Sequence, residues 1–205
     1  MNRKMGMYSS LITFAAVVAF AASMFAGSEY ISYLSSLFIS WGFVPLICSF
    51  ASVCQKEKRA AALTAVAFSS VYALLIAVVY FAQLTAVHFS QLSQQASLIL
   101  NYSKFGLFFF YDLMGYGFMA FSTFFIGLTI KPQKKSEKWL KGLLLIHGVF
   151  AIACILIPLL GIFNADMPGG DLIGTLILEF WCAYFIPLCL LSFKYFKENT
   201  ISIIE

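Results

Sequence analysis

The sequence predicts an all-α polytopic membrane protein with six transmembrane helices, and two observations support this prediction. Apolar side chains occupy 61% of the 205 positions and charged ones only 11%, whereas soluble domains contain about 25% charged residues. The mean hydropathy is +0.90, and the apolar residues gather in six runs, each long enough to cross a hydrocarbon core of about 30 Å. We therefore interpret residues 1–205 as a single six-helix transmembrane domain.

The six runs lie at about 7–26, 31–54, 60–87, 105–130, 139–163 and 172–196. They are predicted to be helices because lipid offers no partner to backbone N–H and C=O groups, and no period-two alternation indicates barrel strands. The first run follows Arg3 and Lys4, as in a signal peptide. Its apolar stretch exceeds the about 7–15 residues of a signal core, so we interpret it as a retained helix.

Basic residues mark one side of the membrane. All but one of the 13 lie near the N-terminus, between the second and third runs, around the junction of the fourth and fifth, or near the C-terminus; the exception is Lys104. The positive-inside rule then places both the N- and the C-terminus in the cytoplasm. Orientation accounts for the net charge of +4 and the pI near 8.8, so we expect a lipid bilayer and no nucleic acid as partner.

The segment between the third and fourth runs has its own pattern. Phe89, Leu92, Ala96 and Ile99 recur at helical spacing, with polar residues between them. Such a pattern is typical of a short amphipathic helix at a membrane surface. We expect this outer helix over about 89–100.

Two carboxylates and one histidine fall inside the predicted spans: Asp112, Glu179 and His147. A charge at the centre of a spanning helix costs on the order of 2.5–3.5 kcal/mol on insertion scales, so such residues usually face the bundle interior and often mark function. With a rise of about 1.5 Å per residue, Asp112 and Glu179 lie at similar depths in the outer half. His147 lies deeper.

These residues suggest a polar pocket in the outer half of the bundle. Tyr116 shares a helical face with Asp112, and Gln83 lies near the outer end of the third run. The candidate pocket therefore comprises Asp112, Glu179, Tyr116, His147 and Gln83. The structural alternative is that these groups only satisfy hydrogen bonds with hydroxyl-bearing neighbours inside the bundle.

No motif indicates a cofactor, a metal site or a catalytic nucleophile. The five cysteines lie in or at the edge of apolar runs without a CxxC or Cys/His spacing. Haem ligation by two histidines would need a partner for His147 at similar depth, and His88 lies near the opposite membrane face. We expect no cofactor and assign no catalytic residue.

Two stretches carry a resemblance. The stretch 111–117 (Tyr-Asp-Leu-Met-Gly-Tyr-Gly), continuing to 127–130, and the stretch 178–182 (Leu-Glu-Phe-Trp-Cys) are similar to small six-helix integral membrane proteins of bacterial genomes, a family without established activity. The resemblance extends over most of the chain. It implies a multi-pass protein of a bacterial plasma or inner membrane.

Three function classes remain open. The first is binding or transport of a small, cationic or protonatable solute, with Asp112 and Glu179 as ligands or proton carriers; six helices are few for a transporter, so a homodimer is then expected. The second is a non-catalytic membrane partner subunit or membrane-stress factor that acts through helix packing. The third is an intramembrane enzyme, for which a single histidine within the spans and the lack of a nucleophile motif give the least support.

Overall fold

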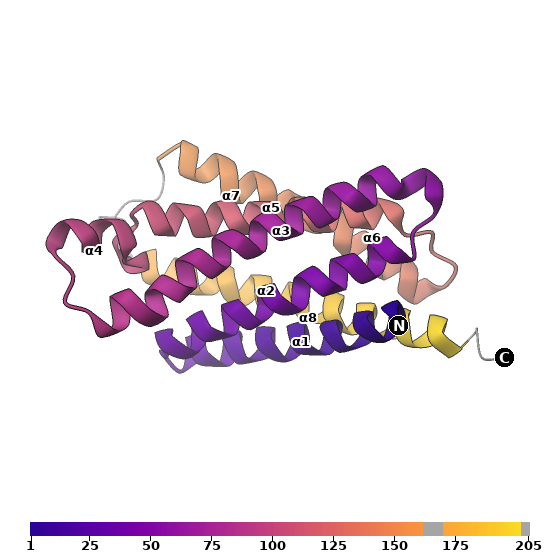
Figure 1. Ribbon diagram of the computed structural model, residues 1–205, viewed down its shortest axis with the longest axis horizontal. Coiled ribbons are helices and arrows are strands. Elements are labelled where there is room, and N and C mark those ends of the chain that lie inside the picture. Colours follow the sequence, from indigo (N-terminus) through magenta and orange to yellow (C-terminus); the bar gives the residue numbers. More distant parts are fainter. Residues whose placement is uncertain (162–169, 202–205) are drawn as a thin grey trace.

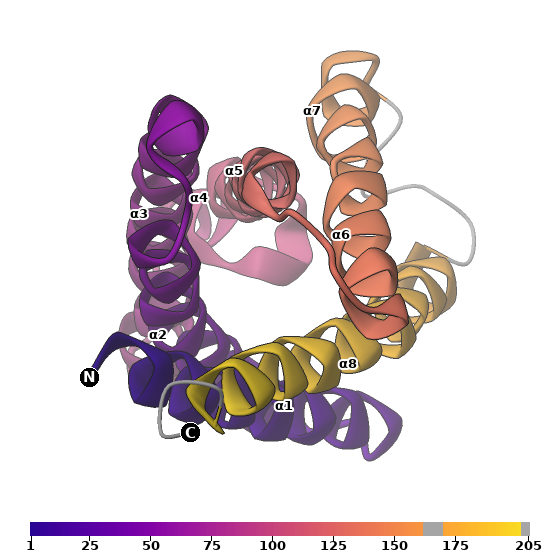
Figure 2. The same cartoon turned by 90° about the vertical axis from the view of Figure 1, so that its right-hand side faces the viewer.

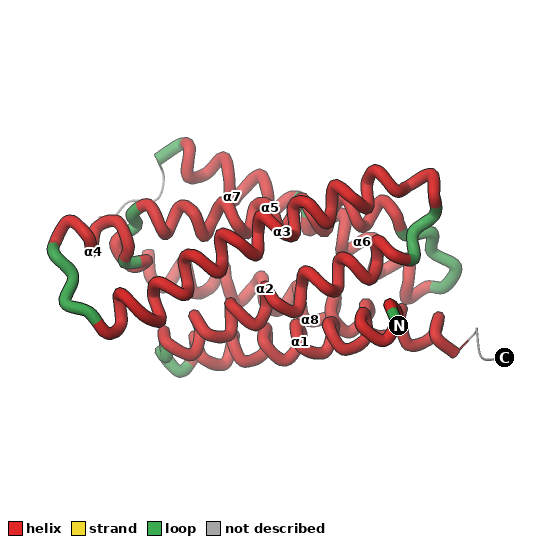
Figure 3. The backbone as a smooth tube through the Cα atoms, viewed as in Figure 1, coloured by secondary structure: helices red, strands yellow, loops and turns green. Residues whose placement is uncertain are grey.

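The computed structural model describes residues 1–161 and 170–201, and within those ranges the chain is helical with no strand. The elements are α1 (Asn2–Phe25), α2 (Glu29–Ser52), η1 (Lys56–Lys58), α3 (Arg59–Ala82), η2 (Gln83–Val87), α4 (Gln94–Leu100), η3 (Tyr102–Lys104), α5 (Leu107–Thr129), α6 (Lys135–His147), α7 (Val149–Leu159) and α8 (Gly170–Ile201). Loops are confined to the two ends of the bundle (Figure 3).

Six helical segments of the described chain are long and apolar enough to cross a membrane. They are Asn2–Phe25, Glu29–Ser52, Lys56–Val87, Leu107–Thr129, Lys135–Leu159 and Gly174–Glu198. The predicted all-α, multi-pass architecture is thereby confirmed. Both described ends of the chain lie at one end of the bundle, opposite α4 (Figure 1). We refer to the end that carries α4 as the outer end, after the predicted orientation.

The helices pack mainly with their neighbours in sequence, with α8 closing the bundle. α1 packs against α2 and α8, α3 packs against α2 and α5, and α5 also contacts α6 and α7. Seen along the bundle, α5 lies between α3 and the α6–α7 pair, while α8 runs beside α1 (Figure 2). The core between them is rich in aromatic rings: Phe43 of α2 contacts Tyr72 of α3 at 5.4 Å and Phe185 of α8 at 6.3 Å between ring centroids.

The contact between α1 and α2 depends on a glycine. A Cβ atom added to Gly42 would lie 2.5 Å from Thr13 Oγ1 and 3.0 Å from the Thr13 backbone nitrogen. Small residues allow this close approach of two membrane helices, which then gain dispersion contacts along their length. The Thr13 hydroxyl is buried and donates to the Ser9 carbonyl, so it has little freedom to move away.

The fifth span differs from the predicted continuous helix over 139–163. It is divided at Gly148, where α6 ends and α7 begins. A Cβ atom at Gly148 would lie 3.0 Å from Phe124 Cβ of α5, so the break lies at a close approach between these two segments. Residues 162 and 163 of the predicted span lie outside the described residues.

The outer helix is shorter than expected. The helix predicted over 89–100 begins only at Gln94, because Ser93 acts as its N-cap. The Ser93 hydroxyl accepts a hydrogen bond of 3.2 Å from the Ala96 backbone N–H, as preferred N-cap residues do. Residues 91–93 lie outside the helix.

We expect Gly42→Ala to destabilise the protein and Gly142→Ala to leave it equally or more stable. Gly42→Ala must displace Thr13, at a cost of about 1–3 kcal/mol for overpacking. Gly142 is also helical, but a Cβ there meets nothing within 4 Å, and alanine favours a helix over glycine by about 1 kcal/mol. Thermal unfolding of the purified variants in one detergent measures both. Equal stability of the Gly42→Ala variant and the parent would contradict the role given to this contact.

Candidate functional site

A cavity of about 390 Å³ lies at the outer end of the bundle. Its walls come from the end of α1, the α1–α2 connection, α2, α3, η3, the beginning of α5 and the described N-terminal part of α8. Among the described residues that line it, Glu29 is the only charged one, and it is exposed. The volume falls within the about 300–1,000 Å³ typical of small-molecule sites.

Three tyrosines form one wall of the cavity, and we call them the tyrosine triad: Tyr33 of α2, Tyr80 of α3 and Tyr102 of η3. Their ring centroids are 5.4 Å apart for Tyr33 and Tyr80, 6.1 Å for Tyr33 and Tyr102, and 6.3 Å for Tyr80 and Tyr102. These distances are those of directly packed rings. The triad thus joins three separate elements at the cavity wall.

Asp112 lies behind this wall. Its side chain is 2% exposed, and the hydroxyl groups of Tyr80 and Tyr102 lie within hydrogen-bonding reach of its carboxyl group. Its Oδ1 atom has no hydrogen-bond partner among the described residues. Asp112 itself does not line the cavity, so the two tyrosines are the shared wall between the cavity and this carboxylate.

Gln83 holds the outer segment in place. Its Nε2 donates to the Leu100 carbonyl at 2.7 Å, and its Oε1 accepts from the Tyr102 backbone N–H at 3.0 Å. The side chain is 3% exposed and stands at the start of the π-helical turn η2, a type of turn that is frequent at functional sites. Gln83 is therefore not a wall residue; it positions Tyr102 in the wall.

The turn from η3 into α5 is also tightly constrained. Phe105, which lines the cavity, has φ +51°, a left-handed conformation that non-glycine residues rarely adopt. A Cβ atom at Gly106 would lie 1.9 Å from the Leu98 carbonyl oxygen of α4. Only glycine permits that approach, which holds α4 against the beginning of α5.

Tyr116 lies deeper on α5 than Asp112. Its ring contacts Tyr72 at 5.8 Å and Trp181 at 5.5 Å. Ser36 and Tyr80 lie within hydrogen-bonding reach of the Tyr116 hydroxyl, whereas the Tyr72 hydroxyl is buried without a hydrogen-bond partner among the described residues. Tyr116 therefore extends a polar, hydroxyl-bearing region from Asp112 toward α8.

His147 belongs to a hydrogen-bonded chain that joins three helices. Trp181 Nε1 donates to His147 Nε2 at 3.1 Å, and Nδ1 lies 2.7 Å from Thr123 Oγ1. Because an indole N–H can only donate, Nε2 must accept, and the ring proton sits on Nδ1 and points to Thr123. The Thr123 hydroxyl in turn donates to the Ala120 carbonyl at 2.8 Å. The chain links α5, α6 and α8 and accommodates a neutral imidazole.

Glu179 is half-buried on α8, and its Oε1 has no hydrogen-bond partner among the described residues. Its neighbour Leu178 lines the cavity, whereas Glu179 does not. No hydrogen bond or ring contact between described residues joins Glu179 to Asp112 or to the tyrosine triad. That the two carboxylates face one cavity stays a prediction.

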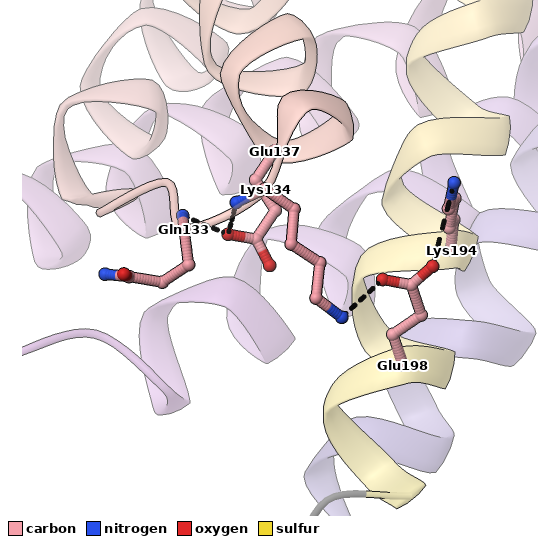
Figure 4. Close-up of polar contacts among 5 residues, drawn as sticks. All are labelled: Gln133, Lys134, Glu137, Lys194 and Glu198. Carbon is pink, nitrogen blue, oxygen red and sulfur yellow. Dashed lines mark hydrogen bonds and ion pairs between the residues drawn. The ribbon is translucent and has the colours of Figure 1, made fainter.

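A group of charged residues lies where α6 begins and α8 ends, and its contacts are drawn in Figure 4. Lys134 Nζ lies 2.8 Å from Glu198 Oε2, and Lys194 Nζ lies 3.7 Å from the other oxygen of Glu198. The hydrogen bond that Lys134 donates to the Glu198 carboxylate raises the pKa of Lys134. Glu137 Oε2 accepts from the Gln133 backbone N–H at 2.6 Å and so fixes the start of α6. The Lys134–Glu198 pair links the start of α6 to α8, and because its lysine is largely exposed it contributes little stability.

The predicted pocket contains none of the three tyrosines of the triad. They lie on three separate elements, so no helical spacing in the sequence connects them. Tyr33 and Tyr80 lie near predicted membrane interfaces, where tyrosine is ordinary. Glu29 lies in a predicted outer connection, where a charge needs no explanation. Among the predicted pocket residues, Asp112 and Gln83 adjoin the triad, and Tyr116 and His147 lie deeper in the bundle.

We expect Gln83→Leu to loosen the outer segment without unfolding the bundle. The variant loses two hydrogen bonds to the backbone of the outer segment and a third to the Val79 carbonyl of α3, each contributing about 0.5–1.5 kcal/mol. Hydrogen–deuterium exchange should speed up for peptides covering 98–106 and stay unchanged in α1 and α2. Gln91→Leu, at an exposed position of the same segment, is the control. Unchanged exchange over 98–106 in the Gln83→Leu variant would contradict the positioning role.

Comparison of the chain with models of known protein families, with curated proteins and with solved structures finds no match in any of the three. The similarity to small bacterial membrane proteins therefore remains a resemblance. The six membrane-spanning segments and the outer cavity are the structural features that bear on function.

Proposed function

We propose that the protein is a membrane carrier that binds a small solute in the outer cavity and exchanges a proton at Asp112. One observation carries this proposal: the cavity and the buried carboxylate share Tyr80 and Tyr102 as their common wall. A solute in the cavity is separated from Asp112 by two side chains that belong to the same cluster of rings.

The buried position of Asp112 supports a functional role. A carboxylate inside a membrane span is costly and persists where it is paired or needed. Here the tyrosine hydroxyls can donate to it when it is ionised, while Oδ1 is left for a further partner. Protonation removes the charge and the need for these donors, which frees the two rings to move. The protonation state of Asp112 thereby controls how freely the two tyrosine rings of the cavity wall can move.

The proposal places the protein in a bacterial plasma membrane, with both termini in the cytoplasm and the cavity facing outward. The distribution of basic residues supports this orientation. Because the chain supplies six spans, we further propose that it works as a homodimer.

Cysteine accessibility tests the cavity and the orientation together. In a variant without native cysteines, Ser32→Cys should react with a small, membrane-impermeant methanethiosulfonate reagent applied outside the cell, because Ser32 lines the cavity. Ser40→Cys, on the same helix with its side chain 0% exposed, should stay unmodified. Lys134→Cys should react only after the membrane is permeabilised. An unreactive Ser32→Cys variant would remove the proposed entry of solute from the outer side.

We expect Asp112→Asn to reach the membrane in normal amounts but to lose the function of the intact gene. The amide retains the size and much of the hydrogen bonding of the carboxylic acid but cannot exchange a proton near neutral pH. The measurement compares a strain that lacks the gene with the same strain carrying the parent or the variant gene, under a growth condition in which the parent gene makes a difference. The Glu179→Gln variant is tested in the same way. Loss of function in both variants supports a single site that uses both carboxylates. Full restoration by Asp112→Asn would refute proton exchange at this residue.

A further inference from the structure

We infer that the solute of the outer cavity is a small organic cation with an alkylated ammonium group, held against the rings of the tyrosine triad. This inference rests on the proposed function and specifies its substrate class. Three features of the cavity carry it: the aromatic wall, the sign of the nearby charges, and the direction in which the hydroxyl groups of the wall donate.

The aromatic wall offers several ring faces to one ligand. A cation interacts with a ring when it lies within about 6 Å of the ring centroid. The triad centroids lie 5.4 to 6.3 Å from one another, so the three rings form one continuous aromatic part of the wall. Tyr33 is inclined at 33° to Tyr80 and at 60° to Tyr102, and Tyr80 is inclined at 29° to Tyr102. Aromatic walls of this kind are the usual binding sites of quaternary ammonium groups.

The charges around the cavity are negative. Glu29 lines the cavity and is exposed to solvent, and Asp112 lies behind Tyr80 and Tyr102. The described outer segment contains one basic residue, Lys104, and it does not line the cavity. A cleft with one sign of charge and low-dielectric walls attracts ligands of the opposite sign. The cavity thus favours a cation over an anion.

Three of the four serine hydroxyls that line the cavity donate to groups of the protein itself. Ser23 donates to the Phe20 carbonyl at 2.7 Å, Ser32 to the Glu29 carbonyl at 2.8 Å, and Ser103 to Asn101 Oδ1 at 2.7 Å. The hydroxyl groups of the triad lie beside carboxylates, Tyr33 near Glu29 and the other two near Asp112. An anionic solute needs donors, and these hydroxyl protons are already engaged. Oxygen lone pairs and ring faces remain, and both suit a cation.

The scarcity of strong acceptors favours an alkylated ammonium over a primary one. A primary ammonium group carries three N–H donors, and each needs an acceptor once water is removed. Glu29 is the one carboxylate among the described lining residues. Methyl groups on the nitrogen remove this requirement and spread the charge over a surface that packs against rings.

Choline and its neutral isostere 3,3-dimethylbutan-1-ol distinguish charge from shape. With the purified Ser32→Cys variant in lipid nanodiscs, choline should slow modification by the methanethiosulfonate reagent. The neutral isostere should not do so at tenfold higher concentration. Acetate serves as the anionic probe and should have no effect. Titration calorimetry with the parent protein and choline provides a readout that is independent of the label.

Ring variants locate the site. Tyr33→Leu should weaken choline binding roughly 5- to 30-fold, the range expected for loss of one partly desolvated cation–π contact. Tyr33→Phe keeps the ring face and should bind within about twofold of the parent. Tyr30→Leu is the matched control, because Tyr30 neighbours this region on α2 but does not line the cavity. Size-exclusion chromatography and thermal unfolding check that each variant is folded.

The outcomes separate the inference from the proposed function. If the Ser32→Cys variant reacts but choline gives no protection and no heat of binding, the inference is wrong and the cavity still stands as a solute site. Equal protection by the neutral isostere, or stronger protection by acetate, also overturns the inference. Equal loss of binding in Tyr33→Leu and Tyr30→Leu would show that choline binds elsewhere. An unreactive Ser32→Cys variant contradicts the proposed function itself.

Discussion

Hydrocarbon offers no hydrogen-bond partner, and this constraint decides the orientation of most polar side chains in the bundle. Serine and threonine hydroxyls on α1 and α2 donate to carbonyls of their own helices, as Ser10 does to Gly6 and Ser36 does to Ser32. These groups satisfy themselves locally and leave the helices free to pack through apolar and small residues. Polar groups that cannot do so must find partners on other helices, and they gather in the outer half around Asp112 and in the deeper chain through His147.

The two groups of polar side chains differ in how many of their polar atoms have a hydrogen-bond partner. In the chain from Trp181 through His147 and Thr123 to the Ala120 carbonyl, each proton has one acceptor. Around Asp112, one carboxylate oxygen and the hydroxyl of Tyr72 lack partners among the described residues. Buried polar groups are normally paired, and an unpaired cluster calls for a reason. A network in which every donor has an acceptor is typical of a structural connection between helices. A network with unpaired polar groups beside a cavity is typical of a site that binds a ligand reversibly.

The parts of this fold that depend on local sequence were predictable, and those that depend on contacts between helices were not. Hydropathy predicts the six spans because each is a continuous apolar run, and Asp112 is conspicuous as a charge within such a run. Ser93 was a readable N-cap signal that would have placed the start of α4 correctly. The break at Gly148 depends on Phe124 of another helix, and an isolated glycine in a helical run has no such meaning by itself. Tyr102 is held in the tyrosine triad by Gln83, whose hydrogen bonds to the outer segment bridge 17 and 19 positions of sequence.

The hydrogen-bonded chain through His147 restricts how the bundle can move. It ties α5, α6 and α8 at one level, and a rotation or slide of any of these helices by one residue would separate Trp181 or Thr123 from the imidazole. Breaking two such buried bonds costs about 1–3 kcal/mol, and no alternative acceptor exists in lipid. Motion of the bundle is therefore easier if these three helices travel as one rigid body. Any displacement then occurs in α1, α2 and α3; the cavity residues Glu29 and Tyr33 lie on α2, and Tyr80 lies on α3.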